Sequence, residues 1–255
     1  MTFIIGAKCK DGVVLVGDRK VSGGIKKFTD KIRPLEAFPT IVFTAAGIQS
    51  LFEEFLEEVQ RLGFSHSKNI EEYNKNNPNN AVAFTVNDFK HICSETIKKM
   101  KQVYSEIENV FSFDEALQVL FVVPEVKNAQ GTPIPRLYFM DMDTCYPQPI
   151  EQGKIVPIGI SHLGQIFLKQ FEIDSDFSMK DIARIGTFII KYIEKENLHD
   201  GVGVGDIEPQ IWFFEDNKGP KEIKDKELKE LLEYVDEEVI NVIKKIGSSS
   251  KFLRG

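Results

Sequence analysis

The fold is decided by the opening stretch TFIIGAKCKDGVVLVGDRK, residues 2–20. Residues 2–9 are mostly apolar, as is typical of a β-strand, and residues 13–16 form a second run rich in β-branched side chains. Between them, Asp11-Gly12 is a dipeptide that favours a tight hairpin turn. The sequence therefore predicts two adjacent antiparallel strands at the start of the chain, on which the rest of the fold is built.

The remaining elements are predicted in groups rather than in alternation. Strands are expected at 31–35, 40–44, 116–123, 136–142, 154–158 and 210–214, and helices at 50–62, 87–107, 165–171, 178–196 and 224–246. Ser50 and Glu53 have the spacing of a capping box, and Ser178 is a suitable N-cap. Residues 63–80, rich in Asn and Lys, are expected to form a loop. Grouped strands and helices favour an α+β fold over a doubly wound parallel sheet.

Composition excludes several classes of partner. The 255 residues suit one domain, expected at 1–247, with a disordered tail at 248–255. A net charge of −7 argues against nucleic-acid binding, and no apolar run approaches the roughly 20 residues that span a bilayer. The three cysteines are far apart, which indicates neither a disulfide framework nor a metal site. We expect a cytoplasmic protein without metal or cofactor and with no membrane partner.

Thr2 is the residue with the most distinctive chemistry. Removal of Met1 would leave a hydroxyl and a free α-amino group on this one residue, and such an amine can accept the hydroxyl proton and activate the nucleophile. The α-amino group has a pKa of about 7.7–8.0, close to the working pH that suits a general base. The alternative is that Thr2, as a small residue, only favours removal of Met1.

Several short motifs together resemble the β-type subunit of the proteasome, a member of the N-terminal-nucleophile hydrolase superfamily. The match is best over residues 2–60, and its pieces are Thr2-x-x-x-Gly6 and residues 10–15, 17–20, 31–32 and 44–47. Asp18 stands sixteen residues after Thr2, as the family requires. The resemblance implies a four-layer αββα sandwich, in which two antiparallel sheets pack face to face with helices outside.

The resemblance also implies a role for each catalytic residue. Thr2 would attack a peptide carbonyl, Lys31 would lie beside it, and Asp18 would hold Lys31 charged and in place. The backbone N–H of Gly47 would point at the developing oxyanion, a contact whose loss typically costs about 10²–10³ in rate. Singly, each residue has an ordinary alternative as a turn cap, a surface lysine or a helix-entry glycine. Their order and spacing together favour the catalytic interpretation.

Two later segments depart from the family pattern. The family places a serine between two glycines near the catalytic amine, whereas residues 157–162 read PIGISH, so that Ser161 is a substitute shifted by one residue. Asp200 matches a family aspartate, but Gly203 stands where the family has a serine. One hydrogen-bond partner of the amine is therefore expected to be missing.

The family's main specificity pocket maps onto Ala45, Gln49 and Glu53, with Val21 on the opposite wall. A small Ala45 would leave the pocket roomy, and the Glu53 carboxylate would favour a basic or long substrate side chain. The alternative is that Glu53 only completes the capping box with Ser50.

Three functions stay open at this point. The first is a threonine-type peptidase that acts on peptide or protein substrates and assembles into a ring-like homo-oligomer. The second is a transpeptidase or amidase of the same superfamily. The third is a non-catalytic structural subunit, against which Asp18 and Lys31 argue and which Gly203 favours.

Overall fold

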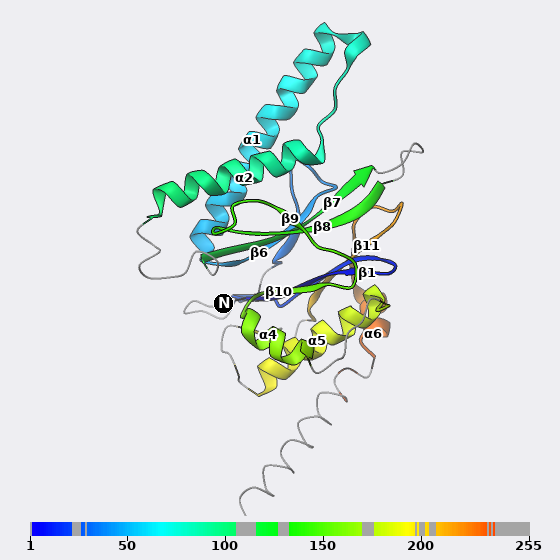
Figure 1. Cartoon of the computed structure of the whole chain (residues 1–255). Coiled ribbons are helices and arrows are strands. Elements are labelled where there is room, and N and C mark those ends of the chain that lie inside the picture. Colours follow the sequence, from blue (N-terminus) through cyan, green and yellow to red (C-terminus); the bar gives the residue numbers. More distant parts are fainter. Residues whose placement is uncertain are drawn as a thin grey trace, which may run out of the picture.

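Two five-stranded antiparallel sheets lie at the centre of the computed structural model, with helices on both outer sides (Figure 1). The structure describes residues 2–21, 27–28, 30–105, 116–126, 133–169, 176–196, 198, 202–203, 208–233, 235 and 237. The first sheet has the strand order β10-β1-β2-β11-β12, and the second has the order β5-β6-β7-β8-β9. A separate two-stranded ribbon is formed by β3 (Lys20–Val21) and β4 (Lys27–Phe28).

The strands of the first sheet are β1 (Phe3–Cys9), β2 (Gly12–Gly17), β10 (Ile155–Gly159), β11 (Gln210–Glu215) and β12 (Lys221–Ile223). Those of the second are β5 (Ile32–Pro34), β6 (Val42–Gly47), β7 (Leu117–Val126), β8 (Pro133–Asp141) and β9 (Gln148–Pro149). The helices are α1 (Gln49–Asn76), the 3₁₀ turn η1 (Pro78–Asn80), α2 (Val86–Val103), α4 (Ser161–Leu168), α5 (Met179–Lys195) and α6 (Asp225–Leu231).

Alternation along β2 shows how the layers are built. Val14 and Val16 belong to the apolar cluster that includes Ile182 and Ile189 of α5, whereas Leu15 belongs to the cluster shared by the two sheets. Successive side chains of a strand point to opposite faces, so one strand contributes to two cores. Residues of α1 and α2 form a third cluster with the outer face of the second sheet. The predicted α+β, four-layer αββα architecture is confirmed.

The start of α1 differs from the prediction. The N-cap is Ile48 and no side chain caps the helix, so the predicted capping box of Ser50 and Glu53 is wrong. The chain enters α1 almost directly from β6, and the Ile48 N–H donates to the carbonyl of Ala116, the residue before β7, at 2.8 Å. A backbone carbonyl thus accepts the N–H of the N-cap residue, and α1 begins without a capping side chain.

The length of α1 is a second correction, since residues 63–76, predicted as a loop, are helical. The asparagines mark only the helix end, where the Asn77 N–H donates to the Tyr73 carbonyl at 2.9 Å and Pro78 follows. The Asn74 side chain exchanges two hydrogen bonds of 2.8 Å with the backbone of Val82. Asparagine favours turns. Here Asn74, which is still within α1, binds the chain that follows the helix and so stabilises the turn after it. The far part of α1 projects beyond the sheets (Figure 1).

Other predicted elements are found with shifted ends. Ser178 caps α5 in a complete capping box with Asp181. The short strands β9 and β12 were not predicted. The described part of the predicted helix 224–246 includes α6, and its later residues from 238, together with the predicted tail at 248–255, lie outside the described residues. Within the described ranges, no helix has the length and apolar character needed to cross a membrane.

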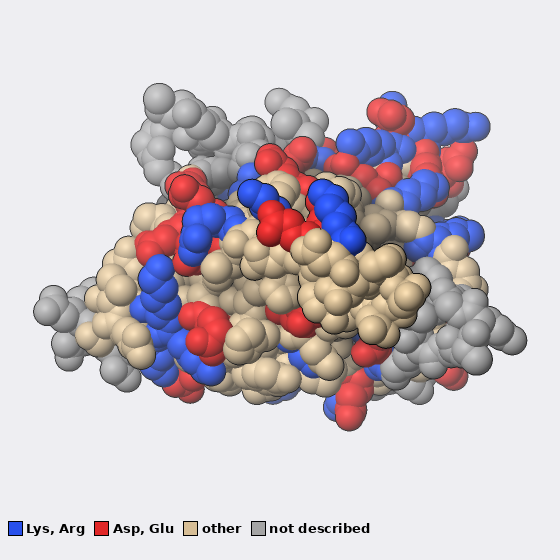
Figure 2. Space-filling view, turned by 90° about the horizontal axis from the view of Figure 1, so that it is seen from above, with Lys and Arg blue, Asp and Glu red and all other residues tan. Residues whose placement is uncertain are grey.

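Charges of both signs are mixed on the face that α1 and α2 cover. Figure 2 shows Lys and Arg interspersed with Asp and Glu in this view. Glu58, for example, pairs with Arg61 at 2.7 Å and with Lys99 at 3.2 Å. Nucleic-acid binding calls for clustered positive charge, and the absence of a nucleic-acid partner stays a prediction from the net charge.

Candidate active site

The end of β10 holds Thr2 in place at the start of β1. Phe3 pairs with Gly159 across the two strands, and the Ile160 N–H donates to the Thr2 carbonyl at 3.1 Å. Gly159 has φ +89°, and a Cβ atom there would lie 1.7 Å from the Thr2 carbonyl oxygen and 3.3 Å from the Ala46 Cβ. Only glycine permits this approach, which brings Thr2 and the end of β6 together.

Asp18 and Lys31 form the ion pair that the sequence predicts, next to the Thr2–Phe3 peptide bond. Asp18 is fully buried. Its Oδ1 accepts a 2.8 Å hydrogen bond from the Phe3 N–H. Lys31 Nζ donates to both Asp18 carboxylate oxygens, at 2.8 Å each. Because Lys31 Nζ and the Phe3 N–H share one acceptor atom, the ammonium group is fixed beside the residue that follows Thr2.

Burial determines the electrostatics of this pair. The Lys31 side chain is only 8% exposed. Its burial lowers the pKa of the ammonium group, and attraction by Asp18 opposes that shift. Two buried charges rarely stabilise a fold more than apolar packing would, but removing one partner is strongly destabilising. The pair therefore keeps a buried positive charge on the carboxylate that also binds the Phe3 N–H, next to the Thr2–Phe3 peptide bond.

Gly203 supports Asp18 through its backbone. That backbone hydrogen bonds the Asp18 carboxylate, and its carbonyl accepts the N–H groups of Arg19 and Lys20 at 3.2 and 3.1 Å. Gly203 has φ +154°, and a Cβ atom would lie 2.2 Å from Glu194 Oε1. A serine at this position would therefore need Glu194 to move, which gives a physical reason for the departure from the family pattern.

We expect a Gly203→Ser variant to be destabilised by about 1–3 kcal/mol, because a side chain here meets Glu194 and adopts an unfavourable φ. Urea unfolding of wild type and variant measures this difference. Gly219→Ser is the matched control, since nothing lies within 4 Å of a Cβ atom at that turn. Equal stability of the two variants would show that the Glu194 contact imposes no constraint.

Gly47 lies at the exposed end of β6, where the chain turns into α1. It has φ +122°, and a Cβ atom would lie 2.3 Å from the Ala116 carbonyl oxygen. Its neighbour Ala46 is the residue that approaches Gly159, and thereby Thr2. A backbone without a side chain at this place fits the expected oxyanion contact, which requires close approach of a substrate.

The predicted specificity residues are only partly described. Ala45 packs in the cluster between the second sheet and its helices. Gln49 Nε2 donates to Glu53 Oε1 at 2.7 Å, and both side chains are exposed on the first turns of α1. Glu53 therefore pairs with Gln49 rather than capping the helix. Val21 belongs to β3, but its side chain lies outside the described residues.

The remaining two predicted site residues cannot be placed in the same way. Ser161 begins α4, directly after the residue that bonds Thr2, but its side chain is not described. Asp200 lies outside the described residues. Both stay predictions.

Two glutamines near the site were missed by sequence reasoning. Gln118 on β7 accepts the Gly159 N–H at 2.8 Å. This hydrogen bond helps to hold Gly159 against the Thr2 carbonyl. Gln210 begins β11 and is 1% exposed. Each stands at the start of an apolar strand run, LQVLFVV and QIWFF. A polar amide in such a run signals a buried hydrogen-bond partner.

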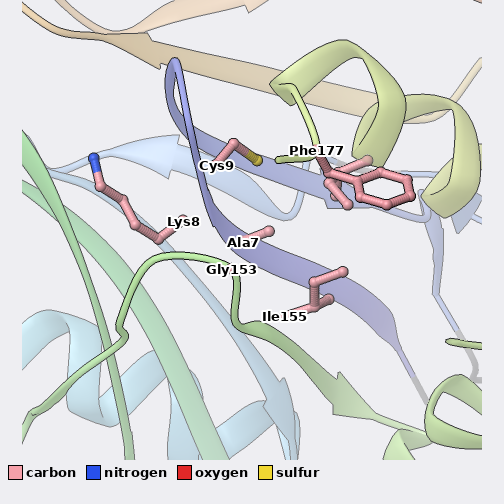
Figure 3. Close-up of a pocket in the computed structure, with 7 residues that line it drawn as sticks. Ala7, Lys8, Cys9, Gly153, Ile155 and Phe177 are labelled. Carbon is pink, nitrogen blue, oxygen red and sulfur yellow. The ribbon is translucent and has the colours of Figure 1, made fainter. Parts of the chain in front are cut away.

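The cysteines are poorly suited to act as nucleophiles. Cys9 lies in a small pocket with Phe177 and Ile182 (Figure 3), and burial raises the pKa of its thiol to about 12. Burial also raises the pKa of Cys93 and of Cys145. A thiol reacts as its thiolate. In the part of the chain that the structure describes, no group of three or more His, Cys, Asp or Glu could hold a metal ion.

Comparison with known proteins identifies the fold. No protein-family model matches the chain, and no curated protein matches its sequence. A Gly-1 mutant of Anbu from Hyphomicrobium sp. strain MC1 is 14% identical, with a TM-score of 0.63, over 96% of this chain and 97% of its own. Anbu from Yersinia bercovieri, described as an ancestral beta-subunit, is 12% identical, with a TM-score of 0.63, over 95% and 97%. The protein therefore shares the fold of these Anbu structures, two antiparallel sheets flanked by helices, which is the fold that the sequence resemblance implied.

Proposed function

We propose that this chain is a threonine-type peptidase in which Thr2, once Met1 is removed, supplies both the nucleophile and its base. The observation that carries the proposal is the Lys31–Asp18 ion pair, buried beside the Thr2–Phe3 peptide bond. A subunit with only a structural role has no need of this arrangement, because apolar residues of similar volume would pack at least as stably.

The residues divide the chemistry among them. The Thr2 hydroxyl attacks the peptide carbonyl, and the Thr2 amine accepts its proton and later donates it to the leaving amine. The Lys31 ammonium disfavours protonation of the Thr2 amine, since like charges repel. The Gly47 N–H stabilises the oxyanion. Water then hydrolyses the Thr2 ester and releases the second product.

Assembly of several copies into a ring is part of this proposal. A ring would enclose the Thr2 sites and confine proteolysis, and head-to-tail contacts close into rings when their rotation permits. A transpeptidase or amidase would use the same nucleophile with an amine in place of water, and it would not need such an enclosure.

The test is a mass measurement of purified protein before and after treatment with a threonine-directed epoxyketone. We expect the mass to lack Met1 and one adduct to form, on Thr2. A variant with lysine inserted between Met1 and Thr2 is the control, because its Thr2 nitrogen stays in a peptide bond and should give no adduct. Reaction of a protein that retains Met1 would contradict the mechanism. Light scattering that reads a 29.0 kDa monomer would remove the ring from the proposal.

A further inference from the structure

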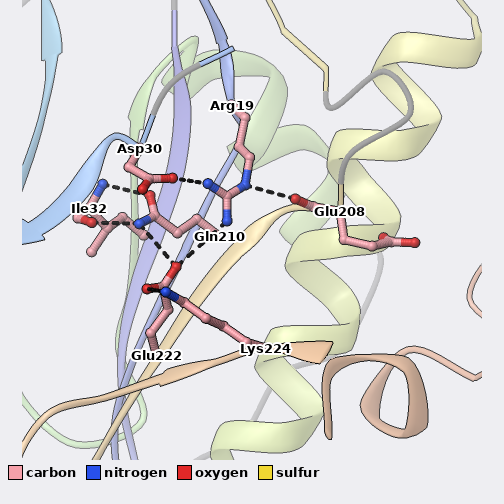
Figure 4. A network of polar contacts seen from close by, with 7 residues as sticks. All are labelled: Arg19, Asp30, Ile32, Glu208, Gln210, Glu222 and Lys224. Atoms are coloured by element: carbon pink, nitrogen blue, oxygen red, sulfur yellow. Dashed lines mark hydrogen bonds and ion pairs between the residues drawn. The ribbon is translucent and has the colours of Figure 1, made fainter. Parts of the chain in front are cut away.

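A buried glutamine binds the backbone next to Lys31. Gln210 Oε1 accepts the Ile32 N–H at 2.8 Å, and Gln210 Nε2 donates to the Ile32 carbonyl at 2.6 Å (Figure 4). Ile32 directly follows Lys31, and both hydrogen bonds join β11 of the first sheet to β5 of the second. The amide of one side chain thus binds both backbone groups of the residue beside the candidate catalytic lysine.

The place of β5 in the second sheet explains why this contact matters. β5 has three residues and is an edge strand, with β6 as its neighbour in the sheet. An edge strand leaves backbone N–H and C=O groups without a strand partner. A glutamine amide carries the same donor and acceptor as a peptide group, so Gln210 takes the place of a neighbouring strand at Ile32. Without it, two buried backbone groups would be left unsatisfied.

The same cluster reaches Asp18. Gln210 lies opposite Gly17 in the β2–β11 ladder, and Gly17 immediately precedes Asp18. A Cβ atom at Gly17 would lie 3.2 Å from Ile32 Cδ1, which shows how closely β2 and β5 approach. The segment that bears Asp18 and the segment that bears Lys31 therefore meet at Gln210.

Charged neighbours orient the amide and fix the residue on the other side of Lys31. Arg19 donates to the Glu208 carbonyl at 2.9 Å and forms ion pairs with Asp30 and, at 3.6 Å, with Glu222 (Figure 4). Glu222 also accepts from Gln210 Nε2 at 3.4 Å and pairs with Lys224 at 2.6 Å. Lys31 thus lies between two anchored residues, Asp30 and Ile32.

We propose that Gln210 is a positioning residue for Lys31: by holding Ile32, it keeps the Lys31 ammonium on Asp18 and beside Thr2. Its effect on the reaction rests on the proposed function, whereas its effect on Lys31 does not. A displacement of about 1 Å in a catalytic group can lower a rate by as much as about 10²-fold.

The first variant is Gln210→Met, which keeps the length of the side chain and removes both hydrogen bonds. We expect its epoxyketone reaction to slow by about tenfold or more. We also expect the pH midpoint of that reaction to rise, because a Thr2 amine without a fixed ammonium neighbour is easier to protonate. Gln60→Met is the matched control, since Gln60 Oε1 accepts the N–H of Glu36 in an exposed hydrogen bond of 3.2 Å. An unchanged midpoint in Gln210→Met would overturn the positioning role.

The second variant, Gln210→Glu, keeps the inference testable if Gln210→Met does not fold. A protonated glutamic acid can donate to the Ile32 carbonyl and accept from its N–H, whereas the ionised form cannot donate. Burial beside Glu222 favours the protonated form, while Arg19 and Lys224 oppose it. We expect the rate of Gln210→Glu relative to wild type to rise as the pH falls. A ratio that does not vary with pH would overturn the inference.

A measurement without catalysis separates this inference from the proposed function. Acetic anhydride labelling followed by mass spectrometry reports the reactivity of Lys31 directly. We expect Lys31 to react slowly in wild type and several-fold faster in Gln210→Met, with exposed lysines such as Lys98 unchanged. If wild type forms no epoxyketone adduct but Lys31 is acetylated faster in Gln210→Met, the proposed peptidase function is wrong and the positioning role of Gln210 is supported. If Lys31 reactivity does not change, Gln210 only joins the two sheets.

Discussion

A Thr2→Ala variant should fold normally and lose all peptide turnover and all labelling by epoxyketones. Alanine keeps the backbone and its N-terminal amine, so the hydrogen bond from Ile160 to the residue 2 carbonyl is unaffected. The hydroxyl that would form the acyl-enzyme is gone, and the alanine side chain offers no nucleophile in its place. Fluorogenic peptide hydrolysis and intact mass after probe treatment measure the loss, and thermal unfolding checks the fold.

Thr2→Ser is the control for that experiment. Serine retains both the hydroxyl and the amine, so labelling should persist at a reduced rate, at the same residue. Normal activity in Thr2→Ala would remove Thr2 from the mechanism. It would also leave the buried Lys31–Asp18 pair without a catalytic explanation.

A Lys31→Met variant should lose epoxyketone labelling by about 10²-fold or more, the lower range for a lost group in acid–base catalysis. The structure adds a second effect, since the fully buried Asp18 would lose its charged partner. Breaking a buried ion pair in this way costs about 3–5 kcal/mol of stability. Probe kinetics and urea unfolding on the same preparations measure the two effects.

The double variant Lys31→Met, Asp18→Asn separates catalysis from stability. The asparagine can still accept the Phe3 N–H, and no unpaired charge remains, so most of the lost stability should return. Labelling should stay low, because the ammonium group is absent. Recovery of labelling together with stability would show that Lys31 acts only through the fold.

Much of the fold could be predicted from short-range patterns. The β1–β2 hairpin followed from two apolar runs around Asp11-Gly12, and the start of α5 followed from Ser178, which is confirmed as its N-cap. The start and length of α1 were predicted wrongly. The N–H of its N-cap residue Ile48 binds the carbonyl of Ala116, which is distant in sequence, and its asparagines act as turn residues only at the helix end.

By itself, the sequence determined the order of the elements and the residue types that meet at the site. Thr2, Asp18, Lys31 and Gly47 each stand at or near the end of a strand, Thr2 and Asp18 in the first sheet and Lys31 and Gly47 in the second. Only the tertiary structure decided which groups hold them: Gly159 against Thr2, the Gly203 backbone on Asp18 and the Gln210 amide on Ile32. These contacts join residues far apart in the chain, and they depend on sheet packing and backbone φ, which no local pattern records.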